Sequence, residues 1–143
     1  MGNPGDAELR ALLERPRQFA VLGAKADVWE AAFYVPKYLV DHGWRAVGVN
    51  PKLAGQTWLG AEAVASLAAL PQVEVVEVFR RSDALPGITD ELLALPWRPT
   101  AVWFQLGIAD EPSAARLREV GITVVQDRCM MPEHRRLVGR APG

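Results

Sequence analysis

The sequence of 143 residues has a single cysteine, only two histidines and no excess of charge of either sign. One cysteine cannot form an internal disulfide, which agrees with a reducing compartment. The cysteine and histidines form no cluster at ligand spacing, so a metal site finds little support. Lys and Arg number 16 against 17 Asp and Glu, so no global field favours nucleic acid or an anionic membrane.

Long hydrophobic runs are also missing. No segment approaches the roughly 18 consecutive apolar residues of a membrane span, and residues 1–6 show no basic stretch followed by an apolar one. We therefore expect a cytoplasmic protein that binds neither membranes nor nucleic acid. Because the length suits one domain, we expect residues 1–143 to fold around one core.

Five short apolar runs recur along the chain, with stretches of helical spacing between them. Such nearly continuous hydrophobic runs are typical of strands buried on both faces of a parallel sheet. Right-handed crossovers then predict an α/β fold: a doubly wound, Rossmann-like, five-stranded parallel sheet, ordered 3-2-1-4-5, with helices on both faces. The predicted strands are 19–22, 46–49, 73–79, 101–105 and 122–125.

Capping residues mark some of the intervening helices. Asp110 is typical of a helix start, and Gly121 of the end of the same helix. Asp6 is expected to cap an N-terminal helix. A small extra turn or strand is expected at 56–58.

Ligands of open parallel sheets bind at the carboxyl ends of the strands, where the connections diverge to opposite faces. The first loop there is a Gly-Ala-Lys turn, whose glycine lets the backbone approach a diphosphate beside the positive end of a helix. The second contains Asn-Pro-Lys, the third two consecutive arginines, and the fourth an amide and another glycine. The candidate binding residues are Gly23, Ala24, Lys25, Asn50, Pro51, Lys52, Phe79, Arg80, Arg81, Ser82, Gln105 and Gly107.

The end of the second strand argues against NAD as the ligand. A dinucleotide fingerprint has three spaced glycines and an acidic residue that holds the ribose hydroxyls. Here only Gly23 is in place, and Asn50 is followed two residues later by Lys52. A lysine at this place suits a phosphate attached to the ribose, which coenzyme A carries. A tight-turn glycine and a solvated surface lysine are the plainer alternatives.

Five blocks of the chain, in order, resemble the small stand-alone CoA-binding proteins, whose domain is similar to that of the succinyl-CoA synthetase α subunit. The resemblance implies that residues 23–25 line the pyrophosphate and that Pro51 and Lys52 contact the 3′-phosphate and adenine. It also implies that 79–82 lie beside the adenine, and that Gln105 and Gly107 close the crevice. The blocks are 20–24, 38–51, 78–82, 103–107 and 127–134.

The segment 28–32 departs from the family pattern. Members usually carry a proline and an arginine there, whereas this chain has Val-Trp-Glu-Ala-Ala. Glu30 puts an anion near the expected pyrophosphate. Trp29 packs either over the pantetheine arm or, as we expect, against a neighbouring helix.

Catalysis finds little support. Cys129, with His134 five residues later, is better explained as a small buried hydrophobe than as a nucleophile. We therefore expect a non-catalytic binder, sensor or carrier of CoA or acyl-CoA. Two alternatives stay open: an NADP(H)-binding or redox-sensing Rossmann protein, since Lys52 also suits NADPH, and an interaction module with a decayed nucleotide site. A homodimer or an unidentified protein partner also stays open.

Overall fold

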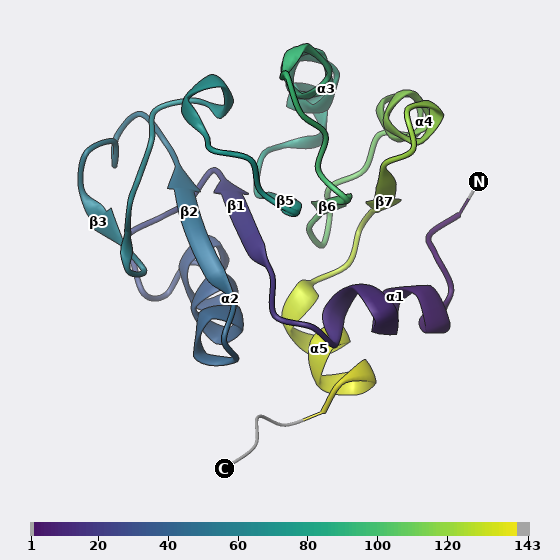
Figure 1. Ribbon diagram of the computed structural model, residues 1–143, viewed down its shortest axis with the longest axis horizontal. Helices are drawn as coiled ribbons and strands as arrows, with labels where there is room; N and C mark the ends of the chain where they lie inside the picture. Colours follow the sequence, from purple (N-terminus) through teal and green to yellow (C-terminus); the bar gives the residue numbers. More distant parts are fainter. Residues whose placement is uncertain (1, 140–143) are drawn as a thin grey trace.

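The computed structural model describes residues 2–139, in which five parallel strands form one sheet between two layers of helices (Figure 1). The predicted α/β fold is confirmed. Met1 and 140–143, part of the single-domain prediction, lie outside the described residues. The sheet strands are β1 (Gln18–Leu22), β2 (Arg45–Val49), β5 (Val75–Val78), β6 (Ala101–Phe104) and β7 (Thr123–Val125).

Helices cover both faces of the sheet because neighbouring strand residues point to opposite sides. In β1, Phe19 and Val21 pack with the helices of one face, and Ala20 and Leu22 with those of the other. The first layer holds α1 (Asp6–Leu13), α2 (Ala31–Asp41) and α5 (Met130–Leu137), and the second α3 (Leu85–Ala94) and α4 (Glu111–Glu119) (Figure 1). No helix within residues 2–139 is long and apolar enough to cross a membrane.

The predicted strand order 3-2-1-4-5 is wrong. The observed order is β2-β1-β5-β6-β7, which is 2-1-3-4-5 in the order of the main strands along the chain. The outer edge of β2 is covered by the segment around Val64. Val64 forms a parallel bridge with Val49 and exchanges backbone hydrogen bonds with Gly48 and Asn50. The third main strand therefore crosses over and pairs with β1.

The chain between β2 and β5 contains a short antiparallel hairpin, β3 (Thr57–Trp58) and β4 (Ala61–Glu62). The extra strand expected at 56–58 is thus present. A 3-10 turn at Leu67–Ala69 follows, and a second one at Ser82–Ala84 precedes α3.

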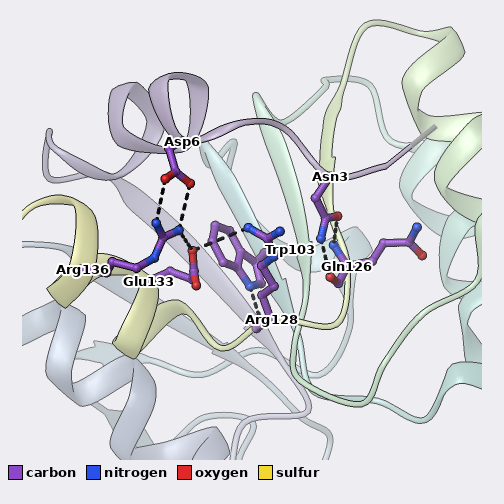
Figure 2. Close-up of polar contacts among 7 residues, drawn as sticks. All are labelled: Asn3, Asp6, Trp103, Gln126, Arg128, Glu133 and Arg136. Carbon is purple, nitrogen blue, oxygen red and sulfur yellow. Dashed lines mark hydrogen bonds and ion pairs between the residues drawn. The ribbon is translucent and has the colours of Figure 1, made fainter.

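Gly121, with a φ of +87°, follows the end of α4 as predicted, and one of the two predicted N-terminal caps is confirmed. The Asp110 carboxylate accepts a hydrogen bond from the Ser113 backbone N–H at 3.1 Å, at the start of α4. Asp6 does not cap α1, whose N-cap is Gly5. Instead, the Asp6 carboxylate accepts two hydrogen bonds from Arg136 of α5, at 2.8 and 3.0 Å (Figure 2).

Polar contacts hold both ends of the described chain against the sheet (Figure 2). The Asn3 side chain pairs with the backbone of Gln126 through two hydrogen bonds of 2.8 and 2.7 Å. The Trp103 indole donates to the carbonyl of Arg128 at 2.7 Å, just before α5. The last loop of the sheet is therefore fixed where it borders the strand ends.

Candidate functional site

The crevice of the sheet lies between the carboxyl ends of β1 and β5. The helix after β1 covers one face and the helix after β5 the other, so the connections diverge here. The two strand ends approach closely: a Cβ added to Gly23 would lie 2.5 Å from the Phe79 carbonyl oxygen and 3.4 Å from Cδ of Arg80. Gly23 also has a φ of +87°, so both space and conformation require glycine.

A pocket of about 470 Å³ opens over this crevice. Its walls come from the turn after β1, the start of α2 and the loops after β5 and β6. The lining residues are Lys25, Glu30, Ala31, Ala32, Phe79, Arg80, Arg81, Ser82, Gly107 and Ile108.

The pocket is suited to an anion. Lys25, Arg80 and Arg81 line it, together with Ala31 and Ala32 of the first turn of α2, where the helix dipole is positive. Arg81 forms an ion pair with Asp83 at 2.7 Å, but both side chains are exposed, so this pair costs little to break. Glu30 is the opposing charge, and its carboxylate has no ion-pair partner within residues 2–139.

Buried side chains hold the first loop from below. The Asn50 amide donates to the Ala24 carbonyl at 2.9 Å, and the Trp58 indole donates to the Lys25 carbonyl at 2.8 Å. Asn50 also accepts from the Lys52 backbone N–H at 2.9 Å. Asn50 therefore joins the first two loops, and its side chain faces the interior rather than the pocket.

The other two loops are cross-linked in the same way. Ser82 lines the pocket while its hydroxyl accepts from the Ala109 N–H at 3.0 Å. The Asp127 carboxylate accepts from the Gly107 N–H at 2.7 Å, and the Asp127 N–H donates to the Ile108 carbonyl at 3.0 Å. Asp127 has a φ of +57°, unusual for a residue with a side chain. Its bonds fix the wall formed by Gly107 and Ile108.

The structure brings together half of the predicted site residues as pocket lining. Gly23 and Ala24 are buried beside that lining, Asn50 and Gln105 are also buried, and Pro51 and Lys52 are exposed on the turn after β2. Because β5 is the neighbour of β1 in the observed strand order, the loop that faces the first turn is 79–82. The predicted residues in the lining are Lys25, Phe79, Arg80, Arg81, Ser82 and Gly107.

Gln105 belongs to a buried pair that the sequence analysis missed. Its amide donates to the Glu77 carboxyl at 2.5 Å, and Glu77 is fully buried in β5. The other carboxyl oxygen, Oε1, has no hydrogen-bond partner among the described residues. Burial raises the pKa of Glu77 well above its usual range, which favours the protonated form of the carboxyl group. The sequence signal for this buried pair was a single Glu within a strand of valines.

The structure places Cys129 and His134 in separate surroundings, and His134 has Tyr38 as its hydrogen-bond partner. Burial raises the pKa of the Cys129 thiol, which disfavours the thiolate. The His134 ring is buried and its Nδ1 lies 2.9 Å from the Tyr38 hydroxyl oxygen. Burial, followed by the nearby His42, lowers the pKa of His134. Residues 2–139 contain no group of three or more His, Cys, Asp or Glu placed to hold a metal ion.

Trp29 corrects another prediction. Its side chain is 86% exposed, so it does not pack against a neighbouring helix. Glu30, the next residue, lines the pocket, but Trp29 is not among the lining residues.

Comparison with known proteins identifies the domain that carries this pocket. A family model described as a CoA binding domain matches residues 17–135. The chain belongs to the CoA-binding domain family. The resemblance inferred from the five sequence blocks is thereby confirmed.

Relatives of this CoA-binding domain extend over nearly the whole chain. YneT of Bacillus subtilis (strain 168) is 34% identical over 135 residues, covering 94% of this chain and 97% of YneT. The structure of cell-free ID.343 from Thermus thermophilus is 47% identical with a TM-score of 0.87, covering 94% of this chain and 99% of the other. A hypothetical protein from Pyrococcus horikoshii OT3 is 31% identical with a TM-score of 0.84, covering 95% and 94%.

Proposed function

We propose that this domain binds coenzyme A through its 3′-phosphorylated ADP moiety, with the diphosphate over the turn between β1 and α2. The observation that carries the proposal is the pocket at the crevice, where Lys25, Arg80 and the start of α2 converge in a chain of the CoA-binding family. The stem of Arg80 lies over Gly23, so its guanidinium belongs to the same small region as the turn. A dianionic diphosphate matches this set of donors.

Lys52 is the proposed partner of the ribose 3′-phosphate. It follows β2, which is paired with β1, and neighbouring strands lie about 4.8 Å apart. An adenosine lying across the ends of β1 and β2 therefore brings a ribose phosphate from the pocket toward the exposed Lys52 side chain. The Asn50 bond to the Lys52 N–H fixes where that lysine leaves the backbone.

A non-catalytic role is part of the proposal. The thiol of Cys129 is held in its protonated form by burial, and His134 hydrogen-bonds to Tyr38. The domain then acts on CoA by holding it, as a sensor, a carrier or the binding component of a larger assembly.

Isothermal titration calorimetry with CoA, dephospho-CoA and NADPH tests this function. We expect saturable CoA binding, and dephospho-CoA weaker by about tenfold, since a charge-assisted hydrogen bond contributes about 1.5 kcal/mol or more. Lys52→Ala should remove that difference, whereas Lys37→Ala, in an exposed ion pair with Asp41 on α2, should leave it unchanged. Equal affinity for both ligands would remove the role given to Lys52. Binding of NADPH without binding of CoA would refute the proposal itself.

A further inference from the structure

The β3–β4 hairpin lies outside the pocket lining, yet it contacts the loop that carries Lys25. Trp58 of β3 makes this contact, because its indole N–H donates to the Lys25 carbonyl at 2.8 Å. Trp58 is 4% exposed, whereas Lys25 is exposed and lines the pocket. A buried side chain from a remote segment therefore holds the backbone of one of the cations of the pocket.

The indole of Trp58 is itself fixed by its neighbours. A Cβ added to Gly48 of β2 would lie 2.8 Å from Cε3 of Trp58, so the ring packs directly on the β2 backbone, where glycine leaves the room. The Phe33 ring of α2 meets the indole edge to face, with the ring centroids 6.4 Å apart. Close packing against both β2 and α2 leaves the indole little freedom to turn. Trp58 is therefore a hydrogen-bond donor in a fixed position.

The loop around Lys25 depends on this donor. Ala24 is the last buried residue after β1, and residues 25–30 are all exposed. The N–H of Lys25 donates to the Ala32 carbonyl at 3.4 Å, which is long for such a bond. The shorter bond from Trp58 therefore ties the exposed part of the loop to the core. A lysine ammonium ends a flexible stem, so the position of its backbone limits where the charge can lie.

We infer that Trp58 is a positioning residue for ligand binding: by fixing the Lys25 peptide, it holds this lysine at the crevice before the diphosphate arrives. The inference rests on the proposed function, which places the diphosphate there. A loop that is ordered before the ligand binds loses less conformational freedom on binding, so its affinity for the ligand is higher. Trp58, buried outside the lining, acts through Lys25.

A double-mutant cycle read by calorimetric titration with CoA tests this inference. Trp58→Phe keeps an aromatic ring and removes the indole donor. CoA affinity should then fall on the order of tenfold, as expected when binding must order about one further residue of backbone. In the Lys25→Ala background, the same substitution should weaken CoA by less than about threefold, because the side chain that it positions is absent. Equal losses in the two backgrounds, or no loss in the wild-type background, would overturn the inference.

Trp103→Phe is the matched control. The Trp103 indole is also buried and donates to a backbone carbonyl, that of Arg128, at 2.7 Å, and neither residue lines the pocket. Each substitution removes one indole hydrogen bond, so urea unfolding should show comparable losses of stability. CoA affinity should nevertheless stay unchanged in Trp103→Phe. A loss of affinity as large as that of Trp58→Phe would assign both effects to general destabilisation and overturn the inference.

An NMR measurement on the wild type covers the case in which a variant does not fold. In isotope-labelled protein, the indole N–H signal of Trp58 should shift as CoA saturates the site, since an anion beside Lys25 polarises the carbonyl that Trp58 binds. The Trp103 signal should stay in place. An unmoved Trp58 signal in protein that binds CoA would overturn the inference. In all of these outcomes the wild type binds CoA, whereas its failure to bind refutes the proposed function.

Discussion

Replacing Gly23 by alanine is expected to damage both stability and ligand binding, for two separable reasons. An L-residue in the left-handed region costs roughly 1–2 kcal/mol, and Gly23 has a φ of +87°. The added Cβ would also lie 2.5 Å from the Phe79 carbonyl oxygen, so the ends of β1 and β5 must move apart. Overpacking of this kind costs typically about 1–3 kcal/mol.

Gly55→Ala is the matched control. Gly55 has a φ of +84°, but a Cβ there would meet nothing within 4 Å. It therefore carries the conformational cost without the clash. Urea unfolding followed by tryptophan fluorescence should give Gly23→Ala a loss of about 2–5 kcal/mol, and Gly55→Ala a loss of about 1–2 kcal/mol.

Ligand binding should separate the two variants further. The displaced carbonyl and the Arg80 stem border the proposed diphosphate position, so CoA affinity should fall by more than tenfold in Gly23→Ala and stay unchanged in Gly55→Ala. Equal losses of stability in the two variants, together with unchanged CoA affinity in both, would refute the close approach of β1 and β5 as the basis of the site.

Two further predictions concern acidic residues in and under the pocket. Glu30→Gln removes the anion from the pocket lining. For charges on the order of 8 Å apart, CoA affinity should then rise by about 0.5–2 kcal/mol, or roughly 2- to 30-fold. Titrations at low and high salt check this prediction, with Glu91→Gln on α3 as control; an unchanged or weakened affinity would contradict it. Glu77→Gln should change the pH dependence of unfolding. The folded-state pKa of Glu77 is raised above the ordinary value of 4.5, so its contribution to stability is complete below that value and is lost as the pH rises through the folded pKa. The stability of Glu77→Gln relative to wild type should therefore increase from pH 5 to pH 9 in urea titrations, whereas a constant difference would show that Glu77 ionises normally.

The elements of the fold could be predicted from the sequence because their signals are local. The apolar runs gave all five strands to within about two residues, and Asp110 gave the start of α4. The strand order could not be predicted in this way, because it depends on a tertiary contact. Val64 pairs with the outer edge of β2, and the sequence of β5 gives no sign that this edge is already paired.

For the site, the sequence predicted which loops form it but not the direction of each side chain. Loop position alone brought Lys25 and 79–82 to the pocket, since strand ends meet at one edge of a parallel sheet. The direction of each side chain was not predictable from position. Asn50 and Gln105 directly follow strand ends, where ligand-binding residues are expected, but both side chains point inward. Asn50 binds the Ala24 carbonyl, and Gln105 binds Glu77.

The position of CoA on the fold is the central claim, and NMR mapping tests it most directly. Backbone amide shifts of labelled wild-type protein are followed while CoA is added. We predict a saturable set of large changes at residues 23–25, 30–32, 79–82 and 107–108, with smaller changes at Lys52. Saturable changes confined to other surfaces, with these amides unmoved, would contradict the account.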